Sequence, residues 1–125
     1  MDIQELQALF AEHKQVKALG KVLCDDSVKN IFMEGVCASA VPVIFSSIIL
    51  KSSDAVSRPY VFVLNDAEEA GYFYHDLVQI LGDSQVFYFP SSFRRAVKFG
   101  QRDAANEILR TEVVSRLNAG HWPLF

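Results

Sequence analysis

The chain has 125 residues, of which 50% are hydrophobic and 12% aromatic, and its formal net charge is -3. The length is typical of a single domain, and the hydrophobic content excludes a disordered chain. The acidic balance argues against a dedicated nucleic-acid-binding module, which would carry a basic face.

The first thirteen residues after Met1, DIQELQALFAEHK, are acidic and amphipathic, so no signal peptide is predicted. The longest apolar run, residues 41–50, is about half of a membrane span. Cys24 and Cys37 belong to no CxxC motif or Cys/His cluster, which suits the reducing cytoplasm. We therefore expect a cytoplasmic protein that makes no membrane contact.

Residues 1–27 are predicted to form an N-terminal helical segment. Apolar residues at helical spacing predict a first helix that reaches Val16, and a shorter second helix covers residues 16–23. Residues 30–33 predict a short strand. Residues 39–52 are apolar on nearly all sides, which indicates a helix packed between layers.

Two further apolar runs of strand length, PYVFVL at 59–64 and QVFYF at 85–89, are separated by a predicted helix. That helix covers residues 67–81, with Asn65 and Asp66 as its cap and Gly82 as its end. The remaining predicted elements are a polar connector at 91–102, a helix at 103–118 and the opening of a strand at 123–125. Because strands that are apolar on both faces alternate with helices, residues 28–125 predict an α/β core, a parallel sheet in a three-layer sandwich.

The stretch MEGVCASAVP has the outline of a phosphate-binding loop between the first strand and its helix. A working loop needs a lysine for the outer phosphates and a hydroxyl for magnesium. The corresponding positions of this degenerate loop are Gly35, Ser39, Ala40, Val41 and Pro42. The lysine, the hydroxyl and one amide are missing, and each contact to a charged group is worth roughly 1.5–3 kcal/mol.

Three such losses approach or exceed the roughly 8 kcal/mol of micromolar binding. We therefore predict no nucleotide binding, no cofactor and no catalytic residue. A glycine followed by small residues also occurs by chance at strand-to-helix turns, so the loop alone is a weak signal.

Four stretches together resemble the N-terminal, UvrB-like subdomain of transcription-repair coupling factors. These stretches are FMEGVCASAVP, RPYVFVLNDAEEAGYFYHDL, QVFYFPSSF and DAANEILRTEVVSRL. The resemblance covers nearly all of the chain beyond the first helix. In UvrB itself the loop is intact, and a long DNA-clamping hairpin follows the third strand, where this chain has only the connector at 91–102.

The resemblance implies a degenerate RecA-like, P-loop helicase fold for one non-catalytic subdomain, residues 1–125, of a much longer chain. The parent would be an ATP-dependent DNA translocase that displaces RNA polymerase stalled at DNA damage and recruits UvrA for transcription-coupled nucleotide excision repair. The partners of this piece would be the parent's other domains, and most of the UvrA contact would lie in an adjacent subdomain. The open alternatives are an active P-loop NTPase or helicase fragment, and an unrelated stand-alone α/β interaction module.

The connector at 91–102 holds the main cluster of basic residues, interleaved with Phe93 and Phe99. These basic residues are Arg94, Arg95, Lys98 and Arg102. They are candidates for contact with a partner, with nucleic acid or with a sister domain, and the alternative is a solvated loop. The three histidines are far apart in sequence and adjoin no cysteine, so no metal site is predicted.

Overall fold

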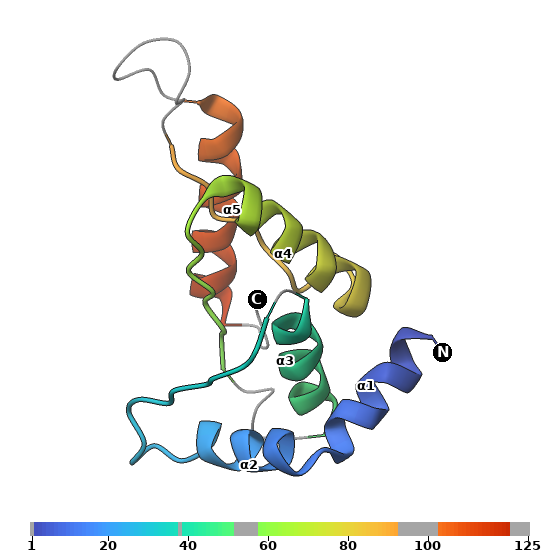
Figure 1. Ribbon diagram of the computed structural model, residues 1–125. Coiled ribbons are helices and arrows are strands. Elements are labelled where there is room, and N and C mark those ends of the chain that lie inside the picture. The colour runs from blue at the N-terminus through green and yellow to red at the C-terminus, as the bar shows by residue number, and fades with distance from the viewer. Residues whose placement is uncertain (1, 38, 52–57, 93–102, 121–125) are drawn as a thin grey trace.

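The computed structural model describes residues 2–37, 39–51, 58–92 and 103–120, and these form five helices (Figure 1). The helices are α1 (Ile3–Glu12), α2 (Lys14–Leu23), α3 (Ala40–Lys51), α4 (Ala67–Leu81) and α5 (Ala104–Ala119). Within these four ranges the chain has no strand and no sheet. None of the helices described is both long enough and apolar enough to cross a membrane.

The predicted α/β fold, a parallel-sheet three-layer sandwich, is therefore wrong: the protein is all-helical over the described residues. Residues 30–33, 59–64 and 85–89 are non-helical connectors and do not form strands. In the connector at 59–64, Tyr60, Phe62 and Leu64 are partly buried, whereas Val61 and Val63 are 79% and 90% exposed. Only one face of this run is covered, and helices cover it. The predicted strand at 123–125 lies outside the described residues.

Helix ends follow from local chemistry. Asp2 caps α1 in a reciprocal pair, because the Glu5 amide donates to Asp2 Oδ1 at 2.8 Å and the Asp2 amide donates to Glu5 Oε2 at 3.1 Å. The first helix ends at Glu12 instead of reaching Val16, since His13 adopts an extended conformation between α1 and α2.

The boundaries predicted for the fourth helix are confirmed. The Asp66 carboxylate accepts a hydrogen bond from the Glu69 amide at 2.8 Å, and acidic side chains in the first turn complement the helix dipole. Gly82 ends α4 with a φ of 84°, a conformation that favours glycine. α4 thus begins and ends where its sequence signals lie.

Helix α3 lies at the centre of the fold and packs against α1, α2 and α4 (Figure 1). One apolar cluster joins Val16 of α2 to Ile48 of α3, supported by Phe10, Leu19, Leu23, Cys24 and Ile44. A second cluster joins Leu77 of α4 to Val86, supported by Ile49, Tyr60, Phe62, Phe73, Tyr74, Val78 and Leu81. Ile48 and Ile49 of α3 therefore serve different clusters.

Helix α5 is attached in a different way, because none of its residues is buried. Arg110 donates a hydrogen bond to the Pro90 carbonyl at 2.9 Å and places its guanidinium 4.0 Å from the centre of the Phe89 ring. Asn106 donates to the Ser91 carbonyl at 2.8 Å. Polar and cation–π contacts to the connector after α4 thus hold much of α5 in place.

Gly20 offers a test of the packing between α2 and α3. A Cβ atom at this position would lie 3.4 Å from Ile48 Cγ2, at the edge of ordinary van der Waals contact. Because glycine in a helix interior is less stable than alanine, Gly20→Ala should raise the free energy of unfolding by about 0.5–1 kcal/mol. Urea denaturation measures this change.

Gly71 of α4 provides the matched control, since a Cβ atom there would meet nothing within 4 Å. Gly71→Ala should therefore raise the free energy of unfolding through helix propensity alone. If Gly20→Ala is destabilising while Gly71→Ala is stabilising, Ile48 cannot accommodate the extra methyl group and the close packing of α2 on α3 is rigid.

Candidate functional site

The predicted degenerate phosphate-binding loop leads into α3 as expected, and its Ala40 amide is already hydrogen bonded within the chain. Gly35 has a φ of 76° and turns the chain, and α3 begins at Ala40. The Ala40 amide donates to the Cys37 carbonyl at 3.2 Å, and the Val43 amide donates to the Ser39 carbonyl at 3.5 Å. Pro42 has no amide hydrogen and its side chain is fully buried in the first turn of α3.

The same loop opens onto an apolar groove of about 780 Å³ between α1, α2, residues 31–36 and the start of α3. We call it the α2 groove. Its lining residues are Leu9, Phe10, His13, Gln15, Val16, Ala18, Leu19, Val22, Ile31, Phe32, Met33, Glu34, Gly35, Val36, Ala40 and Ile44. Phe32 stands at its edge with 89% of its surface exposed. The segment that was predicted to be a degenerate nucleotide loop therefore lines a hydrophobic groove.

Helix α2, which forms one wall of this groove, also carries a row of lysines that do not line the groove themselves. Lys14, Lys17 and Lys21 are exposed and recur at i, i+3 and i+7, and α2 contains no acidic residue. Lys17 Nζ lies 2.5 Å from Glu12 Oε2. Lys14 and Lys21 form no ion pair with any other described residue. Among the described residues, the row therefore includes two positive charges that no salt bridge neutralises.

Glu12 links the end of α1 to α2 and α3. Hydrogen bonds from Lys17 and Lys51, together with the charges of these lysines, lower the pKa of the Glu12 carboxyl from 4.5 to about 2. All three side chains are substantially exposed, so the network is screened by solvent and salt.

Glu12→Gln should make stability less dependent on acid pH. A carboxyl whose pKa is lowered on folding stabilises the protein above its unfolded pKa, and this stabilisation disappears as the pH falls through the folded pKa. The stability difference between wild type and Glu12→Gln should thus be full at neutral pH and shrink between pH 4.5 and about 2. Urea midpoints across this range measure it.

The Lys17→Gln background is the control, since the change at Glu12 should have a smaller effect where one of its two partners is already missing. Parallel stability curves for wild type and Glu12→Gln over the whole acid range would contradict the network.

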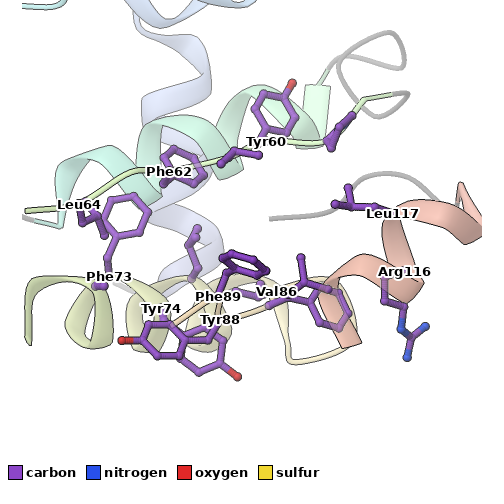
Figure 2. Close-up of a pocket in the computed structure, with 16 residues that line it drawn as sticks. Tyr60, Phe62, Leu64, Phe73, Tyr74, Val86, Tyr88, Phe89, Arg116 and Leu117 are labelled. Carbon is purple, nitrogen blue, oxygen red and sulfur yellow. The ribbon is translucent and has the colours of Figure 1, made fainter. Parts of the chain in front are cut away.

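A second, smaller cavity of about 160 Å³ lies between the connectors at 59–64 and 85–89, α4 and α5 (Figure 2). Seven of its sixteen lining residues are aromatic. The rings of Phe62 and Phe73 are 4.8 Å apart, and those of Tyr74 and Tyr88 are 5.7 Å apart. Burial is the main cause that raises the pKa of Tyr60 on the same wall. These features are those of a packed aromatic core and include no catalytic pair.

The other predicted contact residues, Arg94, Arg95, Lys98 and Arg102, lie outside the described residues. In the part of the chain that the structure covers, no cluster of three or more His, Cys, Asp or Glu side chains could hold a metal ion.

The sequence prediction missed the α2 groove, because its walls come from separate segments. The spacing of three lysines on a helix without acidic residues is the signal that could have drawn attention to it. No protein-family model, curated protein or solved structure matches this chain.

Proposed function

We propose that this chain is a non-catalytic scaffold module from the N-terminal region of a transcription-repair coupling factor, acting in the cytoplasm in transcription-coupled nucleotide excision repair. The four sequence stretches that resemble this family support the assignment. The proposal concerns the role and the parent protein and does not include the sheet that the resemblance implied, because the described residues form no sheet. The parent would supply the ATP-driven DNA translocase and the contacts to RNA polymerase.

One observation carries the scaffold role: large apolar side chains stand almost fully exposed on the connectors. Phe32 is 89% exposed, Val61 79% and Val63 90%. Single exposed apolar residues are ordinary, but several on connectors next to open apolar cavities are typical of surfaces that other domains cover. We propose that the parent's other domains cover them, and that most of the UvrA contact belongs to an adjacent subdomain.

The scaffold role predicts that ATP does not stabilise the protein. The loop lacks a lysine and a magnesium-binding hydroxyl, and the Ala40 amide is already hydrogen bonded. A ligand that binds only the native state raises the melting temperature by mass action. Millimolar ATP with magnesium should therefore leave the melting temperature unchanged in a thermal-shift measurement.

Gly35→Asp is the matched variant for this measurement. A clear ATP-dependent shift in the wild type that Gly35→Asp abolishes would favour an active P-loop NTPase over a scaffold.

The family assignment has its own test. The reading frame downstream of Phe125 should continue and encode an intact GxxxxGK[ST] loop in a separate motor. A UvrA pull-down should recover the longer chain well and the 125-residue chain poorly. A reading frame that ends near Phe125, with no motor, would overturn the assignment and favour a stand-alone interaction module.

The basic cluster can be tested in the same assay. Replacing Arg94, Arg95, Lys98 and Arg102 together with Ser leaves association with UvrA, DNA and the sister domains unchanged if the connector is a solvated loop. Weakened association with one of these would identify its contact.

A further inference from the structure

We propose that the α2 groove is a docking site for an acidic amphipathic helix supplied by a partner protein. The inference rests on the groove and on the lysine row beside it, and it holds whether or not the chain belongs to a repair factor.

The groove has the shape and chemistry of a helix-binding site. Leu9, Leu19 and Phe32 come from α1, α2 and the connector, so apolar side chains from three segments line the open groove. An amphipathic helix binds such a channel through residues at i, i+3, i+4 and i+7. Phe32, almost fully exposed, supplies a large aromatic surface at the edge, the kind of residue that commonly anchors an interface.

The positive charges on α2 indicate which kind of partner helix would bind. Ala18 lines the groove, and it is four residues after Lys14 and three before Lys21, so both lysines lie on the same side of α2 as Ala18. They are two helical turns apart, about 10.5 Å along the axis. A partner helix with acidic residues two turns apart along the flank that faces α2 would meet both charges.

The connector at 31–36 adds a negative charge to the lining of the groove. Glu34 lines the groove beside Phe32, so an acidic flank on that side would be repelled. The occupant we propose therefore has an apolar stripe, carboxylates toward α2 and neutral or basic residues toward Glu34. Lysines with an exposed phenylalanine also suit an anionic membrane, but a concave surface and the Glu34 carboxylate favour a helix over a flat anionic bilayer.

The probe is a fluorescein-labelled designed peptide of about 18 residues, long enough for a helix of several turns. It has leucines at i, i+3, i+4 and i+7, glutamates along one flank and glutamines along the other. A control peptide has the same sequence with lysines in place of the glutamates. Fluorescence anisotropy with the full chain measures affinity, and vesicles of phosphatidylcholine and phosphatidylserine test the membrane alternative by co-sedimentation.

Lys14→Gln combined with Lys21→Gln removes the charges without touching the core, since both side chains are exposed. This double variant should weaken binding of the acidic peptide by about two- to thirtyfold, the range for two exposed ion pairs. The control is Gln79→Glu with Asn118→Glu, which changes the net charge equally on exposed positions of α4 and α5. The control should bind the acidic peptide almost as well as the wild type.

A second pair of variants tests the apolar edge. Phe32→Ser should weaken binding, whereas Val63→Ser, at an equally exposed apolar position on another connector, should not. The proposal is supported if the acidic peptide binds, the lysine peptide does not, and both groove variants bind more weakly than their controls. It is overturned if the two peptides bind equally, if neither binds, if the control variants lose as much affinity, or if only the vesicles bind.

Discussion

Leu77→Ala should lower the free energy of unfolding by about 2–5 kcal/mol, the range measured when a buried leucine is cut back to alanine. Leu77 is 2% exposed and packs against Val86 at the centre of the cluster that joins α4 to both connectors. Removing it leaves a cavity beside aromatic side chains that are only partly buried. Urea denaturation followed by circular dichroism measures the loss.

Leu50→Ala is the matched control, because the same atoms are removed from a side chain of α3 that is 63% exposed. Its effect should stay within about 0.5 kcal/mol. Equal losses at the two positions would mean that Leu77 is not part of a specifically packed core.

Ile48→Ala should lower the free energy of unfolding by a similar amount, about 2–5 kcal/mol, because it disrupts the other apolar cluster. Ile48 is 5% exposed and packs against Val16, so the change removes contacts between α3 and α2. Its chain neighbour Ile49 supports the other cluster. The same urea measurement applies, and the control is the conservative change Ile48→Val, which should cost about 0.5–1.5 kcal/mol.

The double variant, Leu77→Ala with Ile48→Ala, shows whether the two clusters are energetically separate. The two clusters share no supporting residue, and effects at sites without shared partners add to within about 0.5 kcal/mol. A sum that deviates by more than about 1 kcal/mol would show that α3 couples the two clusters into one core.

Local chemistry made parts of this fold predictable. The boundaries of α4 follow from Asp66 and Gly82, and the start of α3 follows from Pro42, which suits a first helical turn. Each of these residues affects only the backbone conformation within a few residues of its own position. The break at His13 was missed because the apolar spacing continues across it from α1 into α2.

The sheet was predicted wrongly because a short apolar run does not show which surface covers it. The run at 59–64 is apolar on both faces, which is typical of a strand in a parallel sheet. In the structure its inner side chains pack on helices: the Phe62 ring lies 5.2 Å from Phe45 of α3 and 4.8 Å from Phe73 of α4. Contacts of this kind join distant parts of the chain and leave no periodic signal.

At the candidate site, too, only the local features could be predicted from the sequence. Gly35 and Pro42 indicated a turn followed by a helix, and the substitutions in the loop argued against nucleotide binding. The α2 groove is assembled from α1, α2 and a connector, so no single stretch of sequence contains its pattern. Only the lysine spacing on α2 is local, and its meaning depends on the apolar surface next to it.

The attachment of α5 has a consequence for the dynamics of the protein. No residue of α5 is buried, so releasing it breaks polar and cation–π contacts, such as those of Arg110, and uncovers the part of the aromatic cavity that Val113 and Leu117 line. Because such an opening leaves both buried clusters intact, its free energy should be below that of global unfolding. Amide protons of α5 can therefore exchange with solvent through this opening while α3 and the clusters on either side of it stay folded.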